Sequence, residues 1–190
     1  EKSKTLYGSS TINQRIGSID YPVSDQSFFQ VNLPVIKHAY DIIKNKMIKK
    51  ARVIDAFSGV GSIGYYLAEQ STSMVMIESN KDAIDMAEHI KKHYHIDNVD
   101  IKYGNVETLI KECEGDILVC DPPRNGLMPE LVDHLMDQPL SQIFYLSCDL
   151  KTLTRDIQRL QEVYDVKNVY PIRMFPQTTE CETLVILERK

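Results

Sequence analysis

The feature that most constrains the fold is a regular alternation of apolar runs and amphipathic segments across residues 52–163. Runs such as ARVIDAF, DILVCDPP and QIFYLSCD are rich in β-branched and other apolar residues. They alternate with segments such as KDAIDMAEHIKKHY, in which apolar residues recur at helical spacing. Nearly continuous apolar strands separated by helices predict a parallel sheet that is covered on both faces. Ligands of such sheets bind beyond the carboxyl ends of the strands.

The two ends of the chain depart from this alternation. The last two apolar runs, YDVKNVYPI and ETLVILERK, follow each other without a helix and predict an antiparallel pair. Residues 1–24 are polar and predict a hairpin or connector, whereas residues 25–190 predict one domain with a helix from Leu33. We therefore expect a Rossmann-like α/β fold: a mainly parallel seven-stranded sheet with helices on both faces and an antiparallel C-terminal strand pair.

The cysteines and the net charge restrict the range of functions that the chain could have. The four cysteines form no CxxC pair and no histidine lies at metal-ligand spacing from them, which argues against a zinc site, an iron–sulfur cluster or a disulfide framework. We expect no metal and no membrane association, a monomer, and a cytoplasmic location. The net charge of −5 is unusual for a free-standing nucleic-acid binder. Because the chain starts at Glu1, we expect a longer protein with a further domain that supplies basic charge.

A glycine-rich loop follows the first apolar run of the sheet. In DAFSGVGSIG the residues Gly59, Gly61 and Gly64 spell GxGxxG, and Glu78 ends the next run. Glycines let the backbone approach a ligand closely, and an acid at this place can accept hydrogen bonds from ribose hydroxyls. The pattern suits NAD and S-adenosylmethionine equally, and it also fits a tight turn without a ligand.

Acidic residues beside this loop favour S-adenosylmethionine over NAD. Asp55 would repel a pyrophosphate but suits the cationic methionine part of S-adenosylmethionine, and Phe57 could stack on adenosine or simply pack the loop. In DPPRNGL, Asp121 ends another strand and two prolines stiffen the turn. Arg124 stands where methyltransferases of the adenine amino group carry an aromatic residue, which argues against that chemistry.

The segment FYLSCDL places Cys148 where a buried strand ends. Taken alone, a free cysteine is more often inert core, and Glu182 is more often a surface acid of an edge strand. Five segments in order change this interpretation: SFFQVN, DAFSGVGSIG, DPPRNGL, YLSCDLKTLTRDI and MFPQTTECETLVIL. Together they resemble the RNA uracil-5-methyltransferases, which make 5-methyluridine in tRNA or rRNA. The resemblance runs from about Ser24 to the C-terminus.

The resemblance implies roles for individual residues. It makes Cys148 the nucleophile and Glu182 the general base. It implies that S-adenosylmethionine is the cofactor and that Asp121 faces both this cofactor and the uracil. The remaining implied cofactor contacts are Gln30, Phe57, Gly59, Gly61 and Glu78, with Ser62 and Asn105 nearby. Family members generally carry an N-terminal RNA-binding domain, which the resemblance implies is absent from this chain.

The implied chemistry needs one thiol, one base and one methyl donor in a single cleft. A thiolate that adds to C6 of uracil makes C5 nucleophilic, and a base then removes the C5 proton. We expect the N-terminus of the helix near LKTLTRDI to lower the pKa of Cys148. The sequence has Glu180-Cys181-Glu182 where the family usually has His-Val-Glu, so Glu180 could share the role of the base.

Arg124, Lys151 and Arg155 flank the expected cleft and are candidates for phosphate contact. Because of the acidic net charge, we expect this chain alone to bind tRNA or rRNA weakly.

Two alternative functions remain: another S-adenosylmethionine-dependent methyltransferase that does not use Cys148, and a non-catalytic module that binds RNA or a partner. An NAD enzyme is a more distant possibility.

Overall fold

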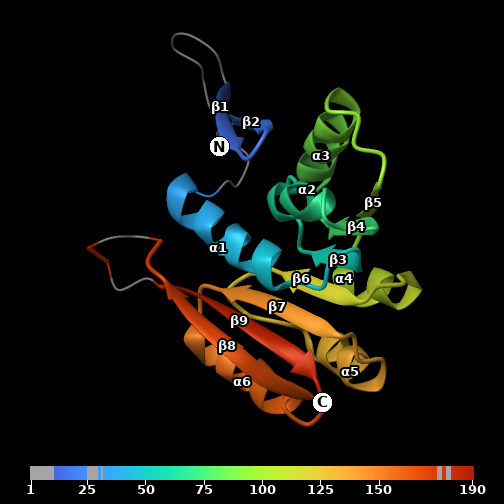
Figure 1. Ribbon diagram of the computed structural model, residues 1–190, viewed down its shortest axis with the longest axis vertical. Coiled ribbons are helices and arrows are strands. Elements are labelled where there is room, and N and C mark those ends of the chain that lie inside the picture. The colour runs from blue at the N-terminus through green and yellow to red at the C-terminus, as the bar shows by residue number, and fades with distance from the viewer. Residues whose placement is uncertain (1–10, 25–29, 31, 175–176, 179–180) are drawn as a thin grey trace.

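The computed structural model describes residues 11–24, 30, 32–174, 177–178 and 181–190 (Figure 1). Its main sheet has seven strands in the order β5-β4-β3-β6-β7-β9-β8. In chain order these strands are β3 (Arg52–Ala56), β4 (Ser73–Glu78), β5 (Val99–Tyr103), β6 (Ile117–Cys120), β7 (Gln142–Ser147), β8 (Tyr164–Ile172) and β9 (Glu182–Arg189). The helices are α1 (Leu33–Lys46), α2 (Ser62–Ala68), α3 (Lys81–His93), α4 (Val106–Leu109), the 3₁₀ helix η1 (Ile110–Glu112), α5 (Pro129–Asp137) and α6 (Leu150–Leu160).

Strands β3 to β7 pair in parallel, and β9 pairs antiparallel with both β7 and β8. This arrangement confirms the predicted fold class, including the antiparallel C-terminal strands. The chain runs from β3 outward through β4 to β5 and then crosses back to β6 on the other side of β3. The direction of winding therefore reverses between β3 and β6, which is where ligands of such sheets bind.

Each face of the sheet has its own hydrophobic core, because successive side chains of a strand point to opposite faces. Phe144 of β7 belongs to the core beneath α1, α2 and α3, whereas its neighbour Tyr145 belongs to the core beneath α4, α5 and α6. All six residues of β7 are buried, as expected for a central strand that is covered on both sides.

A separate antiparallel pair precedes the main sheet and consists of β1 (Thr11–Ile16) and β2 (Ile19–Ser24). Ile16, Ile19 and Tyr21 of this hairpin are buried in the same core as α1 and α2. The backbone N–H of Asp20 also donates a hydrogen bond to the Tyr94 hydroxyl, at 2.9 Å. The hairpin thus packs on the main domain, and the predicted division of the chain at residue 24 stays a prediction.

Capping side chains explain where two helices begin. Asn80 accepts a hydrogen bond from the Ala83 backbone N–H at the start of α3. Asp149 accepts from the backbone N–H groups of Lys151 and Thr152 at the start of α6. Helix α4 continues directly into the 3₁₀ helix η1. Within the described ranges, none of the helices has the length and apolar character that a membrane span requires.

Candidate functional site

A cavity of about 590 Å³ opens beyond the carboxyl ends of the parallel strands. Five residues predicted to contact the cofactor line it, namely Gln30, Phe57, Gly59, Glu78 and Asp121. Ser62 and Asn105 line it as well. The predicted Gly61 is not among the lining residues, and a Cβ atom at this position would come within 2.7 Å of a Tyr65 ring carbon. Glu78 and Asp121, which the sequence placed at strand ends, therefore meet the glycine loop at one cavity, whereas Cys148 and Glu182 are not among its lining residues.

The glycine loop owes its shape to left-handed backbone and to Glu78. Gly59 and Gly61 have φ angles of 55° and 84°, and Phe57 has the unusual φ of 61° for a residue with a large side chain. One Glu78 carboxylate oxygen accepts a hydrogen bond from the Gly59 backbone N–H at 2.9 Å. The other accepts from Ser79 and Asn80, at 2.7 and 2.6 Å. Glu78 thus connects the end of β4 to the loop after β3.

Asp55 is a buried carboxyl group at the base of this loop. Its side chain is 1% exposed, and neither of its oxygens has a hydrogen-bond partner of ordinary geometry among the residues that the structure describes. Burial raises its pKa to about 8, with smaller contributions from the negative charges of Asp121 and Glu78, while the Gly64 amide opposes the shift. A cation that entered the cavity would favour the ionised form of Asp55.

Asp121 directly follows β6, lines the cavity and is half-buried. The side-chain amide of Gln30 donates a hydrogen bond to its Oδ2, at 3.2 Å. Burial raises the pKa of Asp121 to about 7, and the nearby charge of Glu182 adds to the shift, whereas the hydrogen bond from Gln30 opposes it. A carboxyl group of this kind is able to gain and lose a proton near neutral pH.

Cys148 is half-buried and directly follows β7. In the antiparallel pair of β7 and β9, Ser147 lies opposite Thr183. Cys148 and Glu182 are the next residues outward in this register, so the pairing of the strands brings them to the same edge of the sheet. The sequence predicted both residues from widely separated segments, and the fold brings them together beside Asp121.

The expected lowering of the Cys148 pKa by the α6 N-terminus is wrong. The pKa of the thiol is raised, first by burial and then by the negative charge of Glu182, with a further contribution from Asp121. Arg124 and a backbone hydrogen bond act in the opposite direction. The Asp149 side chain accepts from the N–H groups of Lys151 and Thr152, so the first amides of α6 are directed at a carboxylate instead of the thiol.

The other cysteines and predicted contacts have different environments. Cys120 is fully buried in β6, and the Cys181 thiol donates to backbone carbonyl oxygens, with the one on Ile172 at 3.6 Å. Glu180, the suggested second base, lies outside the described residues. Arg155 was a candidate for phosphate contact, but its guanidinium donates to backbone carbonyls of the chain itself, including that of Asn125 at 2.9 Å.

Sequence reasoning missed several residues that line the cavity, among them Asn80, Asp82, Asn125 and Met128. The signal that could have found them is their position, because they fall in the first residues after β4 and in the loop after Asp121. The rule that ligands bind beyond the carboxyl ends of strands applies to whole loops and not only to their first residues.

Comparisons with known proteins agree with this geometry. Residues 106–190 match the family model described as tRNA (uracil-5-)-methyltransferase, and residues 39–138 match the model described as methyltransferase small domain. Proteins named as uncharacterized RNA methyltransferases from Leptospira interrogans and Fusobacterium nucleatum are 31% and 33% identical to the chain. Both alignments cover 100% of this chain, but only 49% and 43% of the relatives. The chain thus spans about half the length of these relatives.

The chain is also similar to a solved methyltransferase structure over nearly its whole length. The tRNA (uracil-54, C5)-methyltransferase of Pyrococcus abyssi, in complex with S-adenosyl-L-homocysteine, superimposes with a TM-score of 0.85 at 28% sequence identity. The match covers 98% of this chain and 48% of that chain.

Proposed function

The chain belongs to the RNA uracil-5-methyltransferase family, and from this membership we propose that it transfers a methyl group from S-adenosylmethionine to C5 of a uridine in tRNA or rRNA. The observation that carries the proposal is the arrangement at one edge of the sheet. Asp121 lines a cavity large enough for a nucleoside-sized ligand, and the charges of Asp121 and Glu182 both act on the thiol of Cys148.

The residues around the cavity fit S-adenosylmethionine. The buried carboxyl group of Asp55, at the base of the glycine loop, suits a ligand that carries positive charge, and when ionised it would disfavour the pyrophosphate of NAD. Glu78 has carboxylate oxygens at the position where ribose hydroxyls are usually bound, and Phe57 offers an aromatic surface to an adenine. When bound, S-adenosylmethionine supplies the electrophilic methyl group that C5 of the uracil takes up.

Cys148 and Glu182 would carry out the bond changes on the uracil. The Cys148 sulfur adds to C6, and the electron pair of the C5–C6 double bond moves toward C5 and the C4 carbonyl. This makes C5 nucleophilic. After methylation, Glu182 removes the proton from C5, the C5–C6 double bond forms again, and the C6–S bond breaks to release the thiolate.

The proton of the Cys148 thiol must also be removed before attack. Burial and two carboxylates raise the thiol pKa, so the protonated form dominates at neutral pH. Asp121, whose pKa is about 7, is suited to accept a proton at this pH, and its electrostatic coupling with both Cys148 and Glu182 supports this role. Arg124 assists because its positive charge favours the thiolate.

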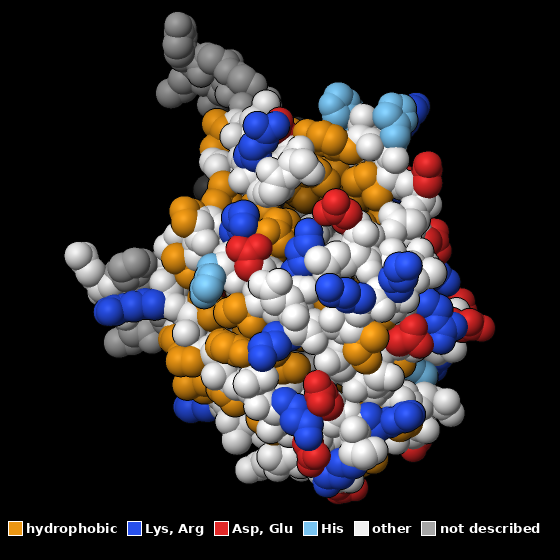
Figure 2. Space-filling view, viewed as in Figure 1, with side chains coloured by type: hydrophobic (Ala, Val, Ile, Leu, Met, Phe, Trp, Pro, Cys, Tyr) orange, Lys and Arg blue, Asp and Glu red, His pale blue; other side chains and the backbone are white. Residues whose placement is uncertain are grey.

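The RNA would be bound largely by parts of the protein outside this chain. On the face in Figure 2, lysine and arginine side chains are mixed with aspartate and glutamate instead of forming one basic patch. The net charge of the chain is −5, and the relatives are about twice as long. A uridine in structured RNA would have to leave its base stack to reach Cys148.

Replacing Cys148 tests the proposed function. Cys148→Ala should abolish methyl transfer to RNA while the protein still binds S-adenosylhomocysteine, because the thiol acts on the uracil and not on the donor. Cys181→Ala is the matched control, since it removes another half-buried free thiol close to Glu182 and should keep the activity. Methyl transfer from labelled donor and calorimetry of S-adenosylhomocysteine binding measure the two effects.

The opposite results would overturn the proposal in different ways. A Cys148→Ala variant that still methylates RNA would indicate a methyltransferase of another mechanism. A wild-type protein that binds neither S-adenosylmethionine nor S-adenosylhomocysteine would indicate a non-catalytic module.

A further inference from the structure

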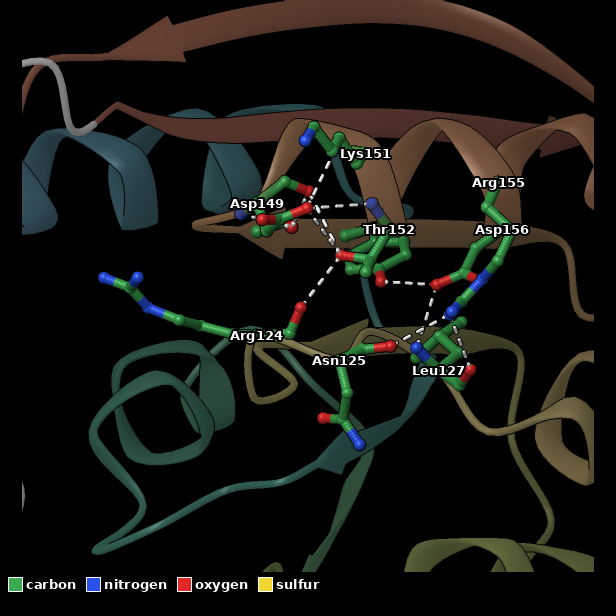
Figure 3. A network of polar contacts seen from close by, with 10 residues as sticks. Arg124, Asn125, Leu127, Asp149, Lys151, Thr152, Arg155 and Asp156 are labelled. Atoms are coloured by element: carbon green, nitrogen blue, oxygen red, sulfur yellow. Dashed lines mark hydrogen bonds and ion pairs between the residues drawn. The ribbon is translucent and has the colours of Figure 1, made fainter.

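One face of helix α6 holds the loop of residues 124–127, which follows Asp121 and the two prolines (Figure 3). The Thr152 hydroxyl donates a hydrogen bond to the Arg124 backbone carbonyl, at 3.1 Å. One turn later on the helix, the Arg155 guanidinium donates to the backbone carbonyls of Asn125 and Leu127, at 2.9 and 3.1 Å. These contacts use backbone atoms of the loop and leave its side chains for other interactions.

Asp156 lies at the centre of these contacts. Its side chain is 1% exposed, and its Oδ2 accepts hydrogen bonds from the Leu127 backbone N–H and the Tyr145 hydroxyl, both at 2.8 Å. Its Oδ1 accepts from Nε of Arg155 at 2.8 Å. Asp156 therefore connects three parts of the site: strand β7, helix α6 and the loop. Because the group is buried, removing its acceptors would leave two buried donors unsatisfied.

Gly126 allows the loop to lie this close to the helix. A Cβ atom at this position would come within 2.6 Å of Oδ2 of Asp156 and 3.0 Å of Cβ of Thr152. The φ angle of Gly126 is 73°, which other residues rarely adopt. The absence of a side chain at position 126 is thus a condition for the contact with Asp156.

The loop and the nucleophile are attached to the same helix. Cys148 lies two residues before α6, and Tyr145, which donates to Asp156, lies three residues before Cys148. On the other side, Asn125 and Gly126 line the cavity. In Figure 3 the Arg124 side chain extends away from the hydrogen-bond network that holds its backbone. The α6 contacts therefore determine where the base of the Arg124 side chain lies relative to Cys148.

We propose that Asp156, together with Thr152 and Arg155, is a positioning residue that holds the loop 124–127 so that Arg124 stays beside the Cys148 thiol. Its relevance to methyl transfer rests on the proposed function, but its effect on the thiol does not. Three charged groups face the thiol: Glu182 from β9, Asp121 from the end of β6 and Arg124 from the loop. Of these three charged groups, Arg124 alone favours the thiolate, and it alone belongs to the segment that Asp156 holds.

The test is the pH dependence of Cys148 alkylation by iodoacetamide, followed by peptide mapping that separates Cys148 from the other cysteines. Asp156→Asn should shift the profile upward by roughly half to one pH unit, which lowers the rate at neutral pH about three- to tenfold. Arg124→Gln should give a similar shift. The double variant should show no further shift, because both changes remove the same charge from the thiol.

Tyr164→Phe is the matched control for the loss of a buried hydrogen bond. The Tyr164 hydroxyl is fully buried with the side chain and donates to the Leu135 carbonyl, on the same side of the sheet but away from the cavity. This variant should lose stability in denaturant without moving the alkylation profile. If Asp156→Asn does not fold, Thr152→Val removes the hydrogen bond to Arg124 and should shift the profile in the same direction.

Three outcomes would overturn the proposal: an unshifted profile in the folded Asp156→Asn or Thr152→Val variant, an unshifted profile in Arg124→Gln, or an equal shift in Tyr164→Phe. None of them depends on RNA or on methyl transfer. Failure of the proposed function would instead appear as a wild-type protein with the expected alkylation profiles but without methyltransferase activity.

Discussion

At the scale of single residues, the site combines one thiol with several carboxyl groups that share a poorly solvated edge of the sheet. Burial raises the pKa values of Asp55 and Asp121 to about 8 and about 7, and the charge of Glu182 raises those of Asp121 and Cys148. A cationic ligand would offset much of this repulsion. The acidic character of the site thus agrees with a sulfonium donor.

Asp55→Asn should flatten the dependence of stability on pH. The pKa of Asp55 is near 3.8 when unfolded and about 8 when folded, so the folded protein holds this proton more tightly. The resulting stabilisation is complete below the unfolded pKa and is lost as pH rises toward 8. In urea unfolding between pH 5 and 8, the variant should lack a decline of up to about 1.4 kcal/mol per pH unit. Parallel curves for both proteins would contradict the assigned pKa.

Glu182→Gln should have opposite effects on thiol reactivity and on turnover. Removing the negative charge should lower the pKa of Cys148, so its alkylation profile should move to lower pH by roughly half a unit. Methyl transfer should nevertheless fall by about 10²-fold or more, because a base is missing. An alkylation profile that moves to higher pH, or an unchanged methyltransferase activity, would show that Glu182 does not have the role assigned to it.

At the scale of elements, sequence patterns predicted most of the fold because periodicity reports which side chains are buried. The apolar runs identified the strands. Because the carboxyl ends of parallel strands lie at the same edge of a sheet, the sequence also placed Asp121 and Cys148 at one edge. The proximity of Cys148 to Glu182 follows from the antiparallel register of β7 and β9. Asp156 could not be recognised, because an aspartate in TRDIQRLQ has the pattern of an exposed helix residue, and only the packed loop makes it buried.

The glycine loop offers a prediction about local conformation. Gly61→Ala should cost roughly 2–4 kcal/mol of unfolding free energy, because φ is 84° and the new Cβ would lie 2.7 Å from a Tyr65 ring carbon. Gly59→Ala should cost only about 1–2 kcal/mol, because it meets left-handed strain but nothing within 4 Å. Urea denaturation of both variants measures the difference. Equal losses would mean that crowding at Gly61 does not matter.

At the scale of the whole molecule, the chain contains a seven-stranded sheet and its cavity but spans about half the length of the relatives it matches. Its charge is −5, and we propose that the RNA is bound largely by parts of the protein outside this chain. The sequence could therefore predict the chemistry better than the substrate, because the residues that select one RNA need not lie in this part of the protein.

This chain alone should bind RNA weakly, and added salt should weaken the binding further. With few phosphate contacts available, we expect a dissociation constant in the micromolar range or above at physiological salt, and a further loss of affinity as salt increases. Fluorescence anisotropy with a uridine-containing RNA hairpin at several salt concentrations measures both quantities. Nanomolar binding that is insensitive to salt would show that the chain has its own specific RNA surface.

The most direct test of the central claim is covalent trapping with RNA that contains 5-fluorouridine. After the Cys148 sulfur adds to C6 and C5 is methylated, the fluorine cannot be removed as a proton, so the enzyme should remain bound to the RNA. The account predicts a complex that survives denaturation, requires S-adenosylmethionine and has its RNA attached to the peptide that contains Cys148. The Cys148→Ala variant should give none. A wild-type protein that methylates uridine in ordinary RNA but forms no adduct, or an attachment at another residue, would contradict the account.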